Sequence, residues 1–453
     1  MAERTIAAIA TPLGEGGIGV IRISGSQALS VADKVFVSAS GKKISSLSGY
    51  SALFGEVRNK DGRIDEAVAL RFSAPKSYTG EDVVELSVHS GTLMVKQVLR
   101  AVLDAGAVLA APGEFTKRAF LNGKMDLIKA ESVMSLISAT NDSELRIARS
   151  VHAGGVAKQL DYVEKKLVSA AASIAAYCDY PEEDLGELNE VVFTQELEKV
   201  RDALDKMLKE YDAGRVLREG IETVIVGRPN VGKSTLMNLL SGVQRSIVTD
   251  IAGTTRDVIE DTVMLGDIPL RLADTAGIRE SKDTVEAVGV DLARQRLKDS
   301  QLVFAVFDAS RPCEKEDEKL LLECKDKCCI VVLNQCDKGY KFDETFAKGM
   351  ERVRISAKTG DGLDALCSAV ARVTKAESLS PDSAVLISER QRDLARRALL
   401  AVNEALDAMG ASVTADAVGV LVDEAIAALY GLTGKRVSDA VTDEIFKKFC
   451  VGK

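Results

Sequence analysis

The pattern of apolar and polar positions divides the chain into stretches of different texture, and the first of them is rich in short strands. Residues 1–118 hold the runs TIAAIA, GVIRIS, AVALRF and VVELSV, separated by turns that contain Gly and Pro. Apolar runs bounded by such turn residues are typical of β-strands. One amphipathic helix is predicted around Leu93 to Ala105. We therefore expect residues 1–118 to form an α+β domain.

Helical periodicity dominates residues 119–217 and returns in residues 377–453. In the run SELRIARSVHAGGVAKQLDYVEKKLVSAAASIAAY, apolar residues recur three and four positions apart with few helix breakers. Between the two helical parts, residues 218–376 alternate helices with buried strands, an order that predicts a largely parallel α/β sheet. The predicted strands are TVIV, LRLAD, LVFAVFD, CCIVVLN and RVRIS. The sequence thus predicts a helical domain interrupted by a compact α/β domain, an insertion that is tolerated when the inserted ends lie close together.

The composition is ordinary for a soluble globular protein. The chain has 453 residues, 46% of them hydrophobic and 28% charged, and at ~150 residues per domain it can hold about three domains. The most apolar late stretch, Val413 to Leu429, contains Asp416, Asp423 and Glu424, which argues against a membrane span. Eight Cys without a secretory signal indicate reduced thiols in a cytoplasmic protein. The net charge of −9 means that any contact with nucleic acid must use a local basic patch or a partner.

A phosphate-binding loop follows the first buried strand of the α/β region. GRPNVGKST, Gly227 to Thr235, matches Gly-x4-Gly-Lys-Ser and lies between a strand and a helix, which is the context that the motif needs. The glycines let backbone N–H groups surround phosphate oxygens, and the helix N-terminus adds favourable potential. Lys233 would neutralise the outer phosphates, and Ser234 would offer its hydroxyl group to Mg²⁺.

Three further motifs identify the nucleotide. DTAG, Asp274 to Gly277, follows a strand and suits metal and γ-phosphate contacts. NQCD, Asn334 to Asp337, provides a carboxylate that can accept hydrogen bonds from guanine N1–H and its 2-amino group. SAK, Ser356 to Lys358, suits backbone contact with guanine O6. The four motifs in this order predict a GTPase of the translation-factor-like class, although Gln335 replaces the usual Lys of Asn-Lys-x-Asp.

The residues around the γ-phosphate indicate how hydrolysis proceeds. Ile278 follows DTAG where Ras-like proteins carry the Gln that orients the attacking water. The segment TDIAGTTRD, Thr249 to Asp257, shows no evident arginine finger. Asn230, with backbone carbonyls of Thr249, Ile251 and Thr254, could hold a monovalent cation in place of such a finger. The alternative is that Asn230 only caps the loop.

Several weaker signals favour structural interpretations. GEGGIG, Gly14 to Gly19, is predicted to be a turn between strands because a strand rather than a helix follows it. No His lies near Cys324, Cys328, Cys329 and Cys336, which favours core or bystander thiols over metal ligands. The basic cluster ERQRDLARRAL is a solvated helix face or an RNA contact. YGLTGKRV contains the Gly-x-x-Gly of KH domains, but its flanks look helical.

Taken together, these residues resemble the MnmE (TrmE) family of bacterial tRNA-modifying GTPases over essentially the whole chain. The resemblance rests on ATPLGEGGIGVIRISG, SYTGEDVVEL, PGEFTKRAFLNGKMDL, the GTPase motifs and the terminal FCVGK. It implies that residues 1–118 fold like folate-dependent one-carbon enzymes, form a homodimer and bind a 5-formyl- or 5,10-methylene-type tetrahydrofolate. The family's folate contacts fall on Arg22, Glu85, Lys124 and Lys453. A pterin edge suits Glu85, and the glutamate tail of folate suits Arg or Lys.

The same resemblance implies partners and further site residues. The family works with an FAD-dependent partner, MnmG, in a heterotetramer, and builds an aminomethyl- or carboxymethylaminomethyl-type group on C5 of the wobble uridine of certain tRNAs. Its water-orienting residue falls on Glu286, its potassium site on Asn230 and the loop Thr249 to Thr255, and its Mg²⁺ ligands on Ser234 and Thr255. Cys450 is a nucleophile or one-carbon carrier, or it packs beside the ligand. The predicted GTP contacts are Asn230, Val231, Gly232, Lys233, Ser234, Thr235, Thr249, Asp250, Ile251, Ala252, Gly253, Thr254, Thr255, Asp274, Thr275, Ala276, Gly277, Asn334, Gln335, Cys336, Asp337, Ser356, Ala357 and Lys358.

Two other functions remain open from the sequence. One is an Era- or Der-like switch that binds ribosomal RNA during assembly, and the other is a one-carbon transferase whose GTPase domain only regulates it. Arg22, Glu85 and the terminal motif favour the tRNA-modifying GTPase over the ribosomal switch. A Der-like protein would also carry a second phosphate loop, which this sequence lacks.

Overall fold

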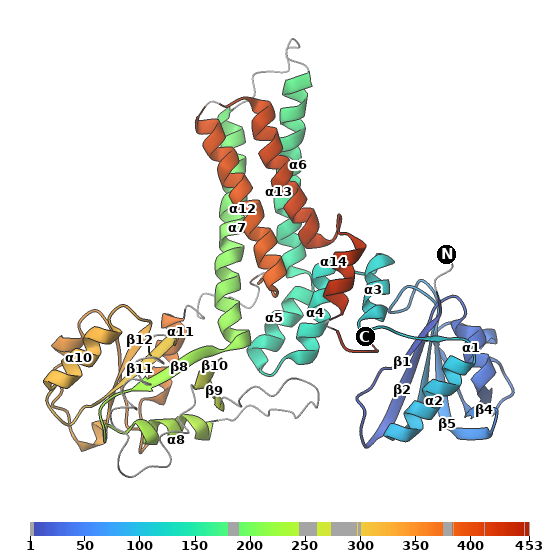
Figure 1. Cartoon of the computed structure of the whole chain (residues 1–453), viewed down its shortest axis with the longest axis horizontal. Helices are drawn as coiled ribbons and strands as arrows, with labels where there is room; N and C mark the ends of the chain where they lie inside the picture. The colour runs from blue at the N-terminus through green and yellow to red at the C-terminus, as the bar shows by residue number, and fades with distance from the viewer. Residues whose placement is uncertain are drawn as a thin grey trace. The chain divides into compact units, whose positions relative to one another are not determined.

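The computed structural model describes residues 4–179, 190–243, 261–272, 297, 300–374, 383, 385–411, 413–447 and 449–452 (Figure 1). Contacts between residues divide the chain into two compact units. The first unit combines residues 1–134 with residues 427–453, and the second unit comprises residues 135–426. The end of the chain therefore folds with its beginning.

The first unit is built on a mixed sheet in the order β3-β4-β5-β6-β2-β1-β7. Neighbouring strands are antiparallel except β1 and β7, which are parallel. The runs predicted as strands from the sequence are confirmed as β1, β2, β5 and β6. The strand bounds are β1 Ile6–Ile9, β2 Gly16–Ser24, β3 Phe36–Ser38, β4 Ser51–Asn59, β5 Gly62–Phe72, β6 Val83–Ser90 and β7 Val108–Leu109.

Helices α1 (Ala28–Val35) and α2 (Thr92–Asp104) cover one face of this sheet (Figure 1). The helix predicted at 93–105 is confirmed as α2, but α1 was not predicted from the pattern. It is only eight residues long, yet it buries positions spaced for one helical face. A short 3₁₀ turn, η1 (Ile44–Ser46), packs close by and buries Ile44 in the same core.

The glycine run at residues 14–19 proves to be mainly strand rather than turn. Strand β2 already begins at Gly16, so the predicted turn is confined to the residues before it. Gly19 faces helix α2, where any Cβ atom would collide with the side chain of Val95. The glycine therefore permits close approach of strand and helix, and no nucleotide needs to be invoked.

The end of the chain packs against helix α3 (Glu114–Leu121) and the start of α4 (Leu127–Ser138). The last helix, α14 (Asp439–Phe446), contributes Phe446, and Phe449 follows just beyond it; both are buried among apolar residues of residues 120–134. The rings of Phe446 and Phe449 lie 5.0 Å apart. Burial of these two rings therefore docks the last helix against α3 and α4.

The second unit contains a group of long helices and a second sheet. Helices α6, α7 and α12 run alongside one another (Figure 1). Asn141 caps α5, and Ser388 caps α12, each by accepting a hydrogen bond from a backbone N–H of the first turn. The basic cluster at 389–399 lies in α12, and helices flank residues 434–437 on both sides. The helices are α5 (Asp142–His152), α6 (Gly155–Asp179), α7 (Glu190–Glu219), α12 (Glu389–Gly410) and α13 (Ala415–Thr433).

The second sheet has the order β13-β12-β11-β8-β10-β9, with only β9 antiparallel to its neighbour. Apolar clusters lie on both faces of it, which explains the nearly continuous apolar strands in the sequence. Every strand predicted for this region is confirmed. The elements are β8 (Ile221–Val226), α8 (Lys233–Val243), β9 (Asp261–Leu265), β10 (Ile268–Leu272), β11 (Leu302–Asp308), α10 (Lys315–Cys324), β12 (Cys329–Asn334), η3 (Cys336–Lys338), η4 (Glu344–Ala347), β13 (Glu351–Arg354) and α11 (Leu363–Val373).

Among the described residues, no helix combines the length and the apolar character that crossing a membrane requires. Within the same ranges, no group of His, Cys, Asp and Glu side chains is arranged to hold a metal ion. Cys324 and Cys329 are instead buried in the apolar cluster beneath α10.

Candidate functional site

The phosphate loop occupies residues 227–232, between the end of β8 and the start of α8. Gly227 and Gly232 both have backbone conformations that favour glycine, with φ of 154° and 96°. A Cβ atom would collide with the Val306 carbonyl oxygen at Gly227 and with the Asn334 amide at Gly232. The glycines of the motif are therefore required by the neighbouring strands as well as by phosphate chemistry. Asn230 is left-handed without being glycine, with φ of 66°.

Lys233 lies inside the loop that precedes it. Its ammonium group donates hydrogen bonds to the carbonyl oxygens of Gly227 and Arg228, each at 2.8 Å. Burial lowers the pKa of Lys233, because a desolvated ammonium group is disfavoured. Ser234 and Thr235 follow in the first turn of α8 and are exposed. The loop thus presents a positive charge and two hydroxyl groups beside a helix N-terminus, which suits phosphate and Mg²⁺.

Arg228 is committed to a structural contact outside the loop. Its guanidinium group lies 2.7 Å from a Glu314 oxygen and 3.0 Å from a Glu316 oxygen, at the start of α10. The hydrogen bond that Arg228 donates to Glu314 is the main reason that the pKa of Arg228 is raised. The one arginine of the phosphate loop is therefore held by carboxylates.

The predicted guanine loop is joined directly to the phosphate loop. Asn334 ends β12 and is buried. Its amide nitrogen donates to the Val231 carbonyl oxygen at 2.9 Å, and its amide oxygen accepts from the backbone N–H of Ala357 at 2.9 Å. One side chain thus links three of the predicted motifs. Ser356 Oγ donates to Asp337 Oδ1 at 2.8 Å, so the carboxylate proposed to read guanine is held by the third motif.

The neighbouring positions of this loop divide into held and exposed groups. The Cys336 thiol donates to the Leu333 carbonyl oxygen, and burial raises its pKa. Lys358 is exposed at the following turn. The carboxyl ends of the parallel strands β8, β12 and β13 place all these segments at one edge of the sheet, as in other nucleotide-binding α/β folds.

Two contacts at Gln335 were not predicted from the sequence. Gln335 Nε2 donates to the Asn230 carbonyl oxygen at 3.0 Å, and Lys338 Nζ donates to Gln335 Oε1 at 2.6 Å. The sequence signal that could have revealed Lys338 is its spacing, three residues after the position that departs from the usual motif. Lys338 is therefore an additional residue of the candidate nucleotide site.

Part of the predicted site lies outside the residues that the structure describes. This holds for the switch segment, for DTAG with Ile278, for the water-orienting carboxylate and for the last residue of the chain. The predictions concerned are Thr249, Asp250, Ile251, Ala252, Gly253, Thr254, Thr255, Asp274, Thr275, Ala276, Gly277, Glu286 and Lys453.

A second candidate site lies on the first sheet. Arg22 of β2 is paired with Glu85 of β6, and Arg22 Nε lies 2.8 Å from Glu85 Oε1. Arg22 Nη1 also donates to the Gly452 carbonyl oxygen at 3.4 Å. Both charged side chains retain about a fifth of their exposure, 18% and 21%. The predicted folate residues Arg22 and Glu85 are thus brought together beside the end of the chain.

Aromatic rings flank the guanidinium group of Arg22. Its central carbon lies 5.5 Å from the ring centroid of Tyr78 and 5.6 Å from that of Phe115, distances at which a cation is attracted to a ring face. The Tyr78 hydroxyl group bonds to Thr116 Oγ1, and burial raises the pKa of Tyr78. These aromatic residues were missed in the sequence because they lie on different segments.

A buried arginine holds the loop that carries Tyr78. Arg118 contacts Glu114 and Glu81 through its guanidinium group, at 2.8 and 3.1 Å. Burial opposes the charge of Arg118, but the two carboxylates outweigh that penalty and raise its pKa. Glu81 also accepts a hydrogen bond from Ser24 Oγ at 2.6 Å. Lys124 contacts the same loop by donating to the Pro75 carbonyl oxygen at 2.9 Å.

The tail is fixed by its backbone. The Cys450 carbonyl oxygen accepts a hydrogen bond from the backbone N–H of Gly113 at 3.3 Å. Gly452 has φ of 96°, and a Cβ atom there would collide with the Ile9 carbonyl oxygen of β1. The thiol of Cys450 is exposed, as is Val451. Backbone contacts therefore hold the tail in place beside Arg22, and the Cys450 thiol is accessible.

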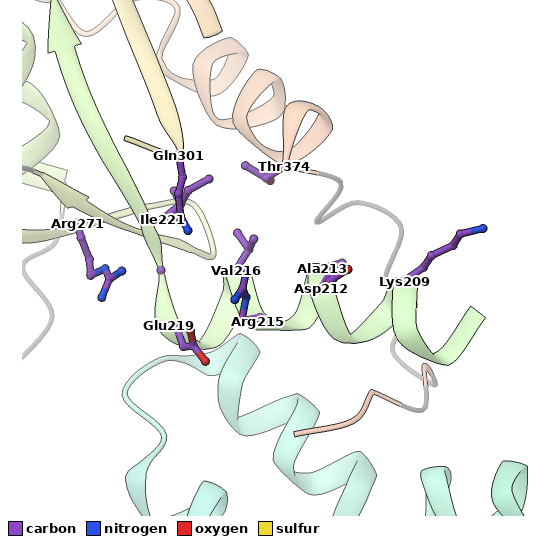
Figure 2. Close-up of a pocket in the computed structure, with 11 residues that line it drawn as sticks. Lys209, Asp212, Ala213, Arg215, Val216, Glu219, Ile221, Arg271, Gln301 and Thr374 are labelled. Carbon is purple, nitrogen blue, oxygen red and sulfur yellow. The ribbon is translucent and has the colours of Figure 1, made fainter. Parts of the chain in front are cut away.

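A cavity of about 500 Å³ lies elsewhere, at the junction of α7 and β8 (Figure 2). It is lined by Arg215 and Glu219 of α7 and by Arg271 and Gln301 beside the first residue of β8. These residues surround the amino-terminal end of the parallel strands, whereas the nucleotide motifs follow their carboxyl ends. None of the predicted site residues that the structure describes lines this cavity.

Family comparisons match almost all of the chain. Residues 5–124 match the GTP-binding protein TrmE N-terminus, and residues 127–450 match the MnmE helical domain. A tRNA modification GTPase MnmE of Acetivibrio thermocellus is 38% identical over 458 residues, covering 100% of this chain and 99% of the relative. Another, of Carboxydothermus hydrogenoformans, is 40% identical over 462 residues and covers 100% of both chains.

Two solved structures are similar to part of this chain. Era of Aquifex aeolicus is 28% identical and covers 40% of this chain and 66% of its own, with a TM-score of 0.25. The G domain of the T. maritima FeoB iron transporter is 23% identical and covers 34% of this chain and 98% of its own, with a TM-score of 0.26.

Proposed function

The chain belongs to the MnmE family of tRNA modification GTPases, and from that premise we propose the chemistry that its two sites serve. With an FAD-dependent partner of the MnmG type in a heterotetramer, it adds an aminomethyl- or carboxymethylaminomethyl-type group to C5 of the wobble uridine of certain tRNAs in the cytoplasm. A tetrahydrofolate derivative supplies the one-carbon unit. GTP hydrolysis, which depends on potassium, drives the conformational cycle.

The ion pair of Arg22 with Glu85, and the contact of Arg22 with the end of the chain, carry this proposal. A guanidinium group flanked by Tyr78 and Phe115 offers charge and ring faces to a flat, anionic ligand. Glu85 offers carboxylate oxygens to the amide and amino edge of a pterin. Lys124 and Lys453 would add positive charge for the glutamate tail of a 5-formyl- or 5,10-methylene-type tetrahydrofolate.

Cys450 is the proposed reactive residue of that site. Its backbone is fixed by Gly113 while its thiol is exposed, so a ligand above Arg22 can be approached by a sulfur nucleophile. The thiolate form of a cysteine is the nucleophile. The alternative assignment, in which Cys450 only packs beside the ligand, is separated by the Cys450→Ser variant described in the Discussion.

For hydrolysis we propose a cation in place of an arginine finger. Asn230 is left-handed at the end of the phosphate loop and exposed, and its side-chain oxygen would join backbone carbonyls of Thr249, Ile251 and Thr254 around K⁺. Ser234 and Thr255 would hold Mg²⁺, and Glu286 would orient the attacking water. Held there, K⁺ would supply positive charge near the transferring phosphoryl group.

We propose three domains: residues 1–118, a helical domain of residues 119–217 and 377–453, and a GTPase domain of residues 218–376. The homodimer is proposed to form through the domain of residues 1–118. Exposed apolar side chains on the outer face of the first sheet support this. Phe54 and Val68 are paired across β4 and β5 and are 58% and 42% exposed. Val68 is also paired with Ser87 of β6, the strand that carries Glu85. An apolar row on a sheet face is typical of a protein interface.

Mass spectrometry of wobble uridines in tRNA tests the proposed function. A strain that lacks this chain should lose the C5 modification, and the wild-type gene should restore it. Lys233→Ala and Glu85→Gln should each fail to restore it, because one removes the phosphate contact and the other removes the pterin contact. Glu66→Gln, a change of an exposed carboxylate on the neighbouring strand β5, should restore it fully.

The alternative functions give different results in the same strain. A ribosome-assembly switch predicts normal wobble uridines together with abnormal ribosomal subunits. A one-carbon transferase with a merely regulatory GTPase predicts that Lys233→Ala still restores a substantial part of the modification.

A further inference from the structure

The guanine loop of this chain departs from the usual Asn-Lys-x-Asp sequence, and the structure contains a replacement for the missing cation. We propose that Gln335 and Lys338 form a clamp that does the work of one lysine. Gln335 fastens the guanine loop to the phosphate loop, and Lys338 supplies the positive charge and fixes the orientation of the Gln335 amide. The proposal rests on the GTPase activity of the family and on none of the proposed tRNA chemistry.

The chemistry of an amide explains why both residues are needed. Gln335 faces a carbonyl oxygen of Asn230 on one side and an ammonium group of Lys338 on the other. The carbonyl can only accept a hydrogen bond, and the ammonium group can only donate one. A neutral amide is a side chain that satisfies both at once. Because Lys338 must meet the oxygen end, it leaves the NH₂ end pointed at the phosphate loop.

The spacing of the pair follows from the local backbone. Gln335 is the N-cap residue of the 3₁₀ helix η3, and Lys338 is the last residue of that helix. The Lys338 backbone N–H donates to the Gln335 carbonyl oxygen at 3.0 Å. With three residues per turn, side chains at positions i and i+3 of a 3₁₀ helix lie directly above one another. Lys338 is therefore placed to meet Gln335 by the turn itself.

The hydrogen bond between Gln335 and Asn230 joins two residues with unfavourable backbone conformations. Gln335 and Asn230 are both left-handed residues other than glycine, with φ of 65° and 66°. Such conformations cost free energy and persist where neighbouring contacts hold them. The hydrogen bond from Gln335 Nε2 to the Asn230 carbonyl oxygen is one such contact. The clamp thus stabilises the shapes of both loops before a nucleotide arrives.

The expected consequence is a change in nucleotide affinity without a change in base choice. The clamp contacts the phosphate loop at Asn230, whereas Asp337 is held separately by Ser356. Loss of Lys338 lets the Gln335 amide rotate, which breaks the link to Asn230 in part of the molecules. A net hydrogen bond contributes about 0.5–1.5 kcal/mol, which corresponds to a weakening of about two- to twelvefold.

Equilibrium binding of a fluorescent GDP analogue to the full-length protein provides the first test. Lys338→Ala should weaken binding by about two- to twelvefold, with the preference for guanine over xanthine nucleotides unchanged. Lys341→Ala is the matched control, because in this structure Lys341 is bonded through its backbone N–H to Ala309. Equal affinities of the two variants would overturn the proposal. Melting temperatures measured alongside verify that both variants are folded.

A double-mutant cycle separates a clamp from two independent residues. Gln335→Lys in the wild-type background places two ammonium groups where one amide now bridges, so it should weaken binding. Adding Lys338→Ala to Gln335→Lys should restore affinity to that of the wild type or better. The sign of the Lys338→Ala effect thus reverses between backgrounds. The same effect of Lys338→Ala in both backgrounds would show that the residues act independently and would overturn the proposal.

Discussion

The two candidate sites of this protein are assembled in opposite ways. The nucleotide site is made of short segments of consecutive residues, and each described segment directly follows a strand of the second sheet. The site on the first sheet joins residues that are remote in sequence, since Arg22 and Gly452 are 430 positions apart. The comparison shows that a site built from the backbone of consecutive residues can be recognised as a motif in the sequence. A contact between residues far apart in the sequence produces no such motif.

Both sites nevertheless depend on glycines in the same physical way. Gly232 in the phosphate loop and Gly452 in the tail have φ of 96° each, and a Cβ atom at either would collide with a neighbouring group. In each case backbone approaches backbone or amide too closely for any other residue. Gly452 is thus required for the same steric reason as Gly232.

The first and largest predicted effect concerns the tail, whose removal should affect only the site on the first sheet. Deleting Cys450 to Lys453 should abolish wobble-uridine modification in cells and weaken folate binding, because Arg22 loses its contact with the end of the chain. GTP hydrolysis should stay nearly intact, because the nucleotide motifs lie in other segments. Modification is measured by mass spectrometry of tRNA, and hydrolysis by phosphate release.

Point variants show which part of the tail matters. Gly452→Ala should reproduce the loss of folate binding, because its Cβ atom collides with Ile9, whereas Val451→Ala should not, because Val451 is exposed. Cys450→Ser then separates the two assignments of the thiol. Lost modification with folate still bound indicates chemistry, and normal modification indicates packing. Wild-type modification by the truncated protein would show that the tail has no part in the site.

The sequence predicted the fold class and the motifs of the nucleotide site, together with strands β1, β2, β5 and β6 of the first sheet and all strands of the second sheet except β9. Those features depend on local periodicity and on consecutive residues, which one sequence displays. It missed helix α1, whose eight residues are too few to stand out as a period. It also placed a turn where β2 begins, because glycines that permit the approach of α2 resemble turn glycines.

The aromatic neighbours of Arg22 and the partner of Gln335 were missed in the sequence for a different reason. Tyr78 and Phe115 reach Arg22 from separate segments, and only the folded sheet brings them together. Lys338 is close in sequence, but its contact depends on the 3₁₀ geometry of η3. Arg22 and Glu85 themselves were predicted through family resemblance, not through any pattern in the chain.

The second predicted effect concerns hydrolysis alone and sharpens the contrast between the sites. Replacing KCl by NaCl at equal ionic strength should lower the turnover of GTP sharply, on the scale of ~10³-fold if the cation substitutes for an arginine finger. Glu286→Ala should lower turnover with GDP affinity retained. Folate binding should not respond to either change. Equal turnover in the two salts would contradict a cation site at Asn230.

The third predicted effect is the smallest and concerns base choice. Asp337→Asn should weaken GTP binding by about 10–100-fold, because charge-assisted hydrogen bonds to the guanine edge are lost. It should strengthen binding of xanthosine triphosphate, because the new amide group donates to the 2-oxo group of xanthine.

The measurement is competition of both nucleotides against a fluorescent GDP analogue, with Asp326→Asn, a change of an exposed carboxylate before β12, as the control. Ser356 holds Asp337 through a hydroxyl group, which can also bond to an amide, so the loop should keep its shape and folate binding should be unchanged. A mutant that still prefers GTP would show that another residue recognises the base. The guanine loop would then no longer be an example of a site that a run of consecutive residues predicts.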